Sequence, residues 1–243
     1  MKGFFKKIFG ARRLNFFTNL ALAFLIFSVG FVCLFPTKDT VVSASGDSIV
    51  RKGNSENGIS LMFNVYQGTE EVYSILKTLD EFNAKATFFV GGSWADDNDK
   101  ALIAILKGGH ELGNHGYFHK DHSRLNKRQN QEEIATCNQY VEVVTGVKMR
   151  LFAPPSGAYS DETLAVADTL NMKTVLWSRD TIDWRDQNPD LIYTRATKNV
   201  GGGELILMHP TKATAKVLYA VLQFYKTNGF SAVTVSENLK IGG

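Results

Sequence analysis

From residue 59 onward, short apolar runs alternate with segments in which apolar residues recur every three or four positions. Short runs bounded by polar or turn-forming residues are typical of buried strands. We therefore predict strands at 59–64, 86–91, 150–153, 173–177, 204–208 and 230–235, and a weaker strand that includes 110–114.

Amphipathic helices are predicted between these strands, because apolar residues spaced i, i+3, i+4 and i+7 share one face of a helix. Gly146 and Gly229 follow two of the apolar stripes, where a glycine commonly ends a helix. The three clearest stripes are Val72, Ile75, Leu76 and Leu79; Ile134, Cys137, Val141 and Val144; and Val217, Val221 and Phe224.

The alternation of strand and helix is repeated about seven times, which predicts parallel strands joined by helical crossovers. Continuous apolar strands support this arrangement, since a parallel sheet is covered on both faces. We expect a closed or nearly closed β/α barrel, with an open doubly wound sheet as the alternative. In both architectures the functional residues lie at the carboxyl ends of the strands.

The N-terminal region differs in composition from this domain. Residues 1–13 carry five cations and no acid, and residues 14–35 form an apolar run without charged side chains. As a helix this run would be roughly 33 Å long, which matches the hydrocarbon core of a bilayer. We predict a single transmembrane anchor at 14–35 in the cell membrane, with 1–13 in the cytoplasm and the remainder outside. A cleaved signal peptide is the alternative, because VVSASG at 41–46 is a loose cleavage site.

The small and polar residues at 36–56 predict a linker, and 57–243 are then the folded domain. Removing the five N-terminal cations from 27 basic residues leaves 22 against 24 acidic ones, a balance of −2. The domain therefore gives no reason to expect nucleic acid as a partner. Cys33 and Cys137 form neither a disulfide framework nor a CxxC metal motif.

Histidine is concentrated in one stretch, HELGNHGYFHKDH at 110–122, which contains four of the five histidines of the chain. A polar surface loop explains any single one of them. His115 and His119, however, are four residues apart and framed by Gly113 and Gly116, and imidazole is the commonest metal ligand. The pair is therefore a candidate metal site.

Other unusual residues follow the predicted strands directly. They are Asn64 after the first strand, APPSGAY at 153–159, WSRDTIDWRD at 177–186 and MHP at 208–210. Because the carboxyl ends of parallel strands meet on one side of a barrel or sheet, these segments and the GNHGYFH loop should surround one active site. That site would combine Asp183, Trp184 and His209 with His115 and His119.

HGYFH, FAPPSGAY, DTIDW and LMHP, in this order, resemble the motifs of the NodB-homology polysaccharide deacetylases. The resemblance covers about residues 57–240. It implies a distorted (β/α)7 barrel that removes N-acetyl groups, and in some members O-acetyl groups, from cell-wall or chitin-like glycans. It also implies a divalent metal, often zinc, with cobalt or manganese as alternatives that the same ligands would accept.

The resemblance implies a role for each matching residue. His115 and His119 would be metal ligands, His209 the general acid, and Asp183 the carboxylate that orients His209. Such a metal polarises the amide carbonyl and activates water, while the acid protonates the leaving nitrogen. The residues that would line the pocket for the acetyl group and the sugar are Pro155, Tyr159, Trp184 and Leu207. Core packing is an alternative role for Tyr159.

The first family motif is altered in this chain. The family places two aspartates after a phenylalanine, one as base and one as metal ligand, where this chain has Asn64 and Val65. Asn64 offers an amide oxygen but cannot accept a proton, and valine offers no ligand at all. Ala153 also stands where the family tends to have an arginine that braces the base.

These substitutions leave two hypotheses open. In the first, Glu70 or the adjacent Glu71 replaces the lost carboxylate, and the chain is a metal-dependent hydrolase of acetamido groups in cell-wall polysaccharide. In the second, the chain is a catalytically impaired glycan-binding protein on the same fold. The sequence does not indicate an oligomeric state.

Overall fold

The computed structural model describes residues 49–240, so the predicted tail, anchor and most of the predicted linker lie outside the described residues. Within 49–240 no helix combines the length and the apolar character that crossing a bilayer requires. The strands of this part are β1 (Ile49–Val50), β2 (Gly58–Val65), β3 (Thr87–Val90), β4 (Glu111–Asn114), β5 (Leu151–Phe152), β6 (Lys173–Val175), β7 (Arg179–Asp180), β8 (Leu205–Met208) and β9 (Ser231–Ala232).

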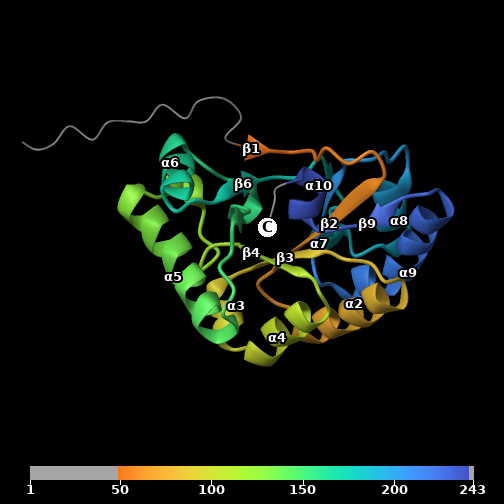
Figure 1. The fold of residues 1–243 in the computed structure, drawn as a ribbon, viewed down its shortest axis with the longest axis horizontal. Helices are drawn as coiled ribbons and strands as arrows, with labels where there is room; N and C mark the ends of the chain where they lie inside the picture. The colour runs from red at the N-terminus through yellow and green to blue at the C-terminus, as the bar shows by residue number, and fades with distance from the viewer. Residues whose placement is uncertain (1–48, 241–243) are drawn as a thin grey trace, which may run out of the picture. The chain divides into compact units, whose positions relative to one another are not determined.

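Around the outside of the sheet pack the helices α5, α3, α4, α2, α9 and α8, in this order from one side of Figure 1 to the other. Their bounds are α2 (Thr69–Glu81), α3 (Gly92–Asp96), α4 (Asp99–Lys107), α5 (Lys127–Thr145), α6 (Asp161–Thr169), α7 (Asp183–Asp186), α8 (Pro189–Thr197), α9 (Lys212–Thr227) and α10 (Val235–Leu239). Two 3₁₀ turns lie at His122–Arg124 and Pro155–Gly157.

The sheet is parallel throughout and follows the order β1-β6-β5-β4-β3-β2-β8-β7, with β9 paired to β2. Only 176–178 separate β6 from β7, although these strands lie near opposite ends of that order. Leu176 donates its N–H to Val50 on one side (2.8 Å), and Ser178 donates to Leu205 on the other (2.9 Å). The sheet is therefore curled into an incomplete barrel, and the chain at 173–180 connects its two ends.

This architecture confirms the parallel β/α fold expected from the alternation of strands and helices. All seven predicted strands are present, with bounds that differ from the predicted ones by a few residues at most. The strands β1 and β7 were not predicted. The predicted boundary between linker and domain, at residues 56 and 57, was wrong. Before it, β1 pairs with β6, and Gly53 donates its N–H to the carbonyl of Gly203 (2.6 Å). Residues 49–56 therefore belong to the fold.

Two apolar clusters follow from the alternation of side chains along each strand. One lies between the sheet and the surrounding helices and includes Leu61, Phe63 and Val65 of β2. The other, which we call the interior cluster, fills the inside of the curled sheet and is closed by α10; it comprises Met62, Phe89, Leu151, Ala153, Val175, Leu205, Val235 and Leu239. Asn64 shares the strand face of Met62, so it points toward the inside at the carboxyl end of β2.

Candidate functional site

A cavity of about 310 Å³ opens at the carboxyl ends of the strands. Residues from all five strand-end segments singled out in the sequence line it, which confirms that these segments converge. The lining residues are Asn64, Tyr66, His115, His119, Ser156, Trp177, Asp180, Trp184, Leu207 and His209.

His115 follows β4 directly and is almost completely buried, with 1% of its surface exposed. Its Nδ1 donates to the carbonyl oxygen of Ala153 (2.7 Å), which fixes the ring and leaves Nε2 without a proton. Burial, with a smaller contribution from His119, lowers the pKa of His115 to about 3. The imidazole is therefore neutral at pH 7, the form in which histidine binds metals.

His119 belongs to a tight loop in which Gly116 (φ 73°) and His119 itself (φ 55°) adopt the left-handed conformation. The loop brings the His119 ring to 5.1 Å from the His115 ring, measured between centroids. On its other side the His119 ring packs against Tyr66, with centroids 4.1 Å apart. Burial also lowers the pKa of His119.

His209, which also lines the cavity, forms a hydrogen-bonded pair with Asp183. The fully buried Asp183 accepts from His209 Nδ1 (2.8 Å) and from the His209 backbone N–H (2.6 Å). Thr214 and the Trp184 backbone also donate to this carboxylate, at 2.6 and 2.9 Å. A carboxylate on Nδ1 sets the tautomer and orientation of a histidine that exchanges protons through Nε2.

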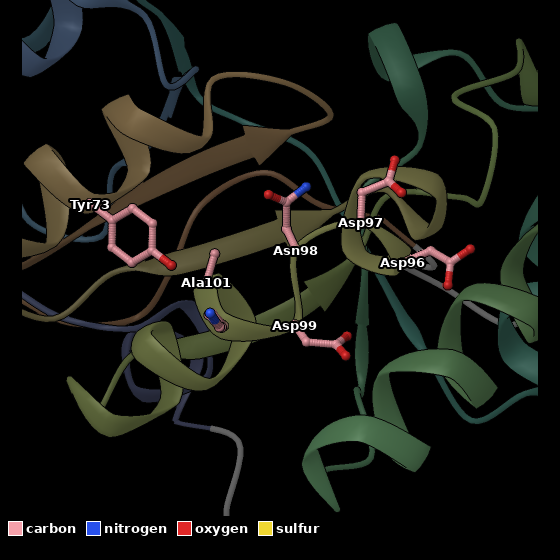
Figure 2. A pocket seen from close by; sticks show the side chains of 7 residues that line it. Tyr73, Asp96, Asp97, Asn98, Asp99 and Ala101 are labelled. Carbon is pink, nitrogen blue, oxygen red and sulfur yellow. The ribbon is translucent and has the colours of Figure 1, made fainter.

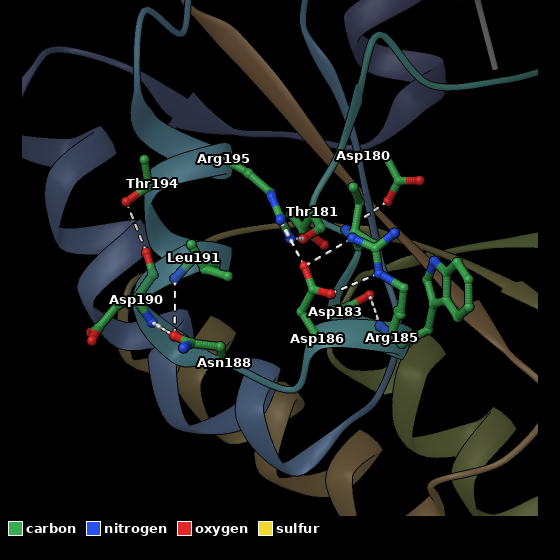
Figure 3. Close-up of polar contacts among 12 residues, drawn as sticks. Asp180, Thr181, Asp183, Arg185, Asp186, Asn188, Asp190, Leu191, Thr194 and Arg195 are labelled. Carbon is green, nitrogen blue, oxygen red and sulfur yellow. Dashed lines mark hydrogen bonds and ion pairs between the residues drawn. The ribbon is translucent and has the colours of Figure 1, made fainter.

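Ion pairs next to this pair hold α7 and α8 in place (Figure 3). Asp186 pairs with Arg185 and with Arg195, both at 2.7 Å. Arg195 also donates to the carbonyl of Thr181 (2.8 Å), and Asn188 caps the start of α8 through its side-chain oxygen. These contacts fix the segment that carries both Asp180 and Asp183.

Asn64 is the residue of the altered first motif that reaches the cavity. Only 2% of its surface is exposed, and its Oδ1 has no hydrogen-bond partner. Val65 is fully buried in the cluster between sheet and helices and does not line the cavity. Ala153 lies in the interior cluster, where only its carbonyl serves the site.

The side chains around His115 and His119 do not fit a catalytic divalent metal. Such sites use three protein ligands, commonly with a carboxylate or thiolate among them. Among residues 49–240, no three His, Cys, Asp or Glu side chains are grouped closely enough to hold a metal ion. At the position of the first family motif, the cavity offers only the neutral amide of Asn64.

The structure does not bring every predicted site residue into the cavity. Glu70 lies at the start of α2 and, with Glu71, lines a separate cavity beside Lys212 and Lys216. The structure therefore does not place it where a replacement ligand would have to be. Pro155 is buried and Tyr159 is partly exposed, and neither lines the cavity; Ser156 of the same segment does. Trp184 and Leu207 line it as expected.

Four lining residues were missed: Tyr66, Ser156, Trp177 and Asp180. Ser156, Trp177 and Asp180 lie within strand-end segments marked in the sequence, which predicted their place along the chain but not the direction of their side chains. Tyr66 is only two residues beyond Asn64, and Asp180 belongs to the two-residue strand β7, which carries no periodic signal.

A second cavity, lined by an acidic stretch between α3 and α4, is separate from this site (Figure 2). The carboxylates of Asp96, Asp97 and Asp99 lie apart from one another in Figure 2. Tyr140 donates its hydroxyl to Asp99 (2.8 Å), so this carboxylate has a structural role.

The family model for polysaccharide deacetylases matches residues 51–175, which is half of the chain. The chain belongs to the polysaccharide deacetylase family. This deacetylase-family chain is 36% identical to the protein YlxY of Bacillus subtilis (strain 168) over 213 residues, 84% of this chain and 67% of YlxY. It is 31% identical to the peptidoglycan-N-acetylmuramic acid deacetylase PdaC of the same organism. That match covers 74% of this chain but only 38% of PdaC.

Solved structures of deacetylase-family proteins share the fold. A crystal structure of BA3943, a CE4 family pseudoenzyme from Bacillus anthracis, matches with a TM-score of 0.76 and 33% identity, over 79% of this chain and 68% of that one. A mutant of BA3943 with restored enzymatic activity matches equally well, with a TM-score of 0.76 and 31% identity, over 79% and 71% of the two chains.

Proposed function

We propose that this polysaccharide deacetylase family member binds cell-wall glycan in the cavity and releases acetate from it slowly or not at all. The observation that carries this proposal is Asn64, which lines the cavity at the position of the family's base and whose buried amide oxygen has no hydrogen-bond partner. An amide cannot take a proton from water, and losing a positioned base typically lowers the rate by ~10²–10⁴.

The rest of the site favours retained binding of a sugar. The cavity keeps the pair formed by His209 and Asp183, together with Trp184 and Leu207, and its volume suits a small ligand. The similarity to PdaC, a peptidoglycan deacetylase, supports cell-wall glycan as the ligand, and the similarity to BA3943, a pseudoenzyme, supports impaired turnover.

A slow, metal-dependent deacetylase is the second candidate, favoured by the intact hydrogen bond between His209 and Asp183. His209 would protonate the leaving nitrogen, as in the family, while His115 and His119 would need a further ligand from outside the cavity to hold zinc, cobalt or manganese. For both candidates we propose a location at the outer face of the cell membrane, supported by the charged tail and the apolar run at 14–35.

The test is acetate release by the purified full-length protein from an N-acetylglucosamine oligomer, alongside glycan binding measured by calorimetry. We expect binding without detectable acetate for the natural chain. Asn64→Asp should release acetate when zinc is added, by about 10²–10⁴-fold over the natural chain, because it restores a carboxylate at the family's base position in the cavity that both imidazoles line. His209→Ala in the Asn64→Asp background should abolish that gain.

Two results would decide against the proposal. Acetate release by the natural chain that a chelator or His115→Ala abolishes would establish the second candidate. Failure to bind any cell-wall glycan oligomer would exclude both readings of the site.

A further inference from the structure

The charge of the cavity differs from that of a metal-dependent hydrolase. Among the residues that line it, Asp180 is the only acid and no lysine or arginine is present. A bound divalent ion would make such a site strongly positive. Because the side chains around His115 and His119 do not fit such an ion, the charged lining residue that a sugar meets is the carboxylate of Asp180.

Asp180 is held in place by its own segment. Its Oδ1 accepts the backbone N–H of Ile182 (2.7 Å), which fixes the carboxylate at the end of β7. Arg185 lies within electrostatic range of Asp180 but forms its ion pair with Asp186, at 2.7 Å (Figure 3). Arg179 donates to the carbonyls of Lys198 and Asn199, at 2.9 and 2.6 Å.

His209 also lines the cavity, and it is paired with the buried Asp183 at 2.8 Å. A proton on His209 is therefore balanced by a carboxylate directly behind it. Together, His209, Asp183 and Asp180 carry a net negative charge whether or not His209 is protonated.

Aromatic rings form the other walls. Tyr66 is 37% exposed and Trp184 54% exposed, and both line the cavity with Trp177. The Tyr66 ring lies between two histidines, 4.1 Å from the His119 ring and 6.5 Å from the His209 ring. Aromatic faces attract ammonium groups, and tryptophan is the most effective of them.

We propose that the cavity prefers a glycan with a free, protonated 2-amino group to the same glycan with an N-acetyl group, and that Asp180 is the residue that selects it. This inference rests on the proposed glycan-binding function. The chain would then recognise wall glycan from which an active deacetylase has already removed acetyl groups, the product class of its own family's reaction.

The test compares a glucosamine tetramer with an N-acetylglucosamine tetramer by calorimetry with the full-length protein, at a pH where the amine is protonated. We expect the glucosamine oligomer to bind about ten- to hundredfold more tightly, the range of a charge-assisted hydrogen bond. The preference of the natural chain should also shrink as the salt concentration is raised.

Asp180→Asn keeps the acceptor for the Ile182 N–H and should reduce the preference to less than about threefold. Asp97→Asn, which removes an acid from the separate cavity between α3 and α4, should leave it unchanged. Tyr66→Ala should weaken binding of both oligomers, while Tyr73→Ala, a tyrosine of similar exposure on α2, should not.

The outcomes separate the inference from the function on which it rests. Tighter or equal binding of the N-acetylated oligomer would overturn the inference but leave the glycan-binding function standing. An unchanged preference in Asp180→Asn would also overturn it. Binding of neither oligomer would remove the proposed function itself.

Discussion

His110 shows how one histidine of the cluster serves the fold and not the site. It lies at the start of the β4 segment with 6% of its surface exposed, packs edge-on against Phe88, and accepts the N–H of Ala86 through Nδ1 (3.3 Å). Burial, assisted by the charge of Lys85, lowers its pKa to about 4. The folded protein therefore holds His110 neutral, whereas the unfolded chain protonates it near pH 6.5.

The consequence is a loss of stability in acid. Because the folded pKa of His110 lies below its unfolded value, its contribution is complete above about pH 6.5 and falls as the pH drops toward 4, by at most roughly 1.4 kcal/mol per pH unit. His110→Gln removes this proton uptake, so its free energy of unfolding should decline less between pH 7 and pH 5. Urea denaturation at both values measures the difference, and parallel declines would show that His110 does not contribute.

At the scale of elements, the loop with His115 and His119 is held by a single side chain of α5. Glu133 is 3% exposed and accepts the backbone N–H groups of Tyr117 (3.0 Å) and Phe118 (2.8 Å). It also pairs with Lys120 at 2.8 Å, whose side chain is 51% exposed. A left-handed loop has no regular backbone hydrogen bonds of its own, so this carboxylate supplies its acceptors.

Glu133→Ala should therefore lower the free energy of unfolding by about 2–4 kcal/mol, since two partly buried N–H groups lose a charged acceptor. Lys120→Ala is the matched control and should cost less than about 1 kcal/mol, because its ammonium remains solvated. Chemical denaturation of both variants measures this. Equal losses would show that the ion pair, and not the backbone contacts, provides the stability.

The sequence allowed the elements and the meeting of five strand ends to be predicted, because both follow from periodicity and from the geometry of parallel strands. It could not reveal that Glu70 points to a different cavity from Asn64, since six residues span a turn whose direction depends on packing. Nor could the sequence reveal β1 and β7, because a strand of two residues has no periodic pattern. These strands are defined by their pairing, β1 with β6 and β7 with β8.

At the scale of the whole molecule, the interior cluster depends on matching a large residue with a small one across neighbouring strands. Phe89 of β3 is directly paired with Gly113 of β4. A Cβ atom at position 113 would lie 2.5 Å from Cδ1 of Phe89, far inside van der Waals contact. The glycine next to the candidate metal-binding loop is thus required by packing.

Substitutions at this pair should be strongly non-additive. Phe89→Ala should cost about 3–5 kcal/mol through the cavity it leaves, and Gly113→Ala about 1–3 kcal/mol through overpacking. In the double variant the added methyl meets open space, so the total loss should be smaller than the sum of the two. Guanidinium denaturation of the four proteins measures the coupling, and additive losses would contradict the pairing.

The residues at 173–180 touch both ends of the curled sheet, and the same short stretch supplies Trp177 and Asp180 to the cavity wall. The same short segment of backbone therefore closes the curled sheet and shapes the cavity. Substitutions that alter ligand specificity are therefore more constrained within 173–180 than at Trp184, which belongs to α7. A substitution within 173–180 that changes ligand preference should therefore also change the melting temperature.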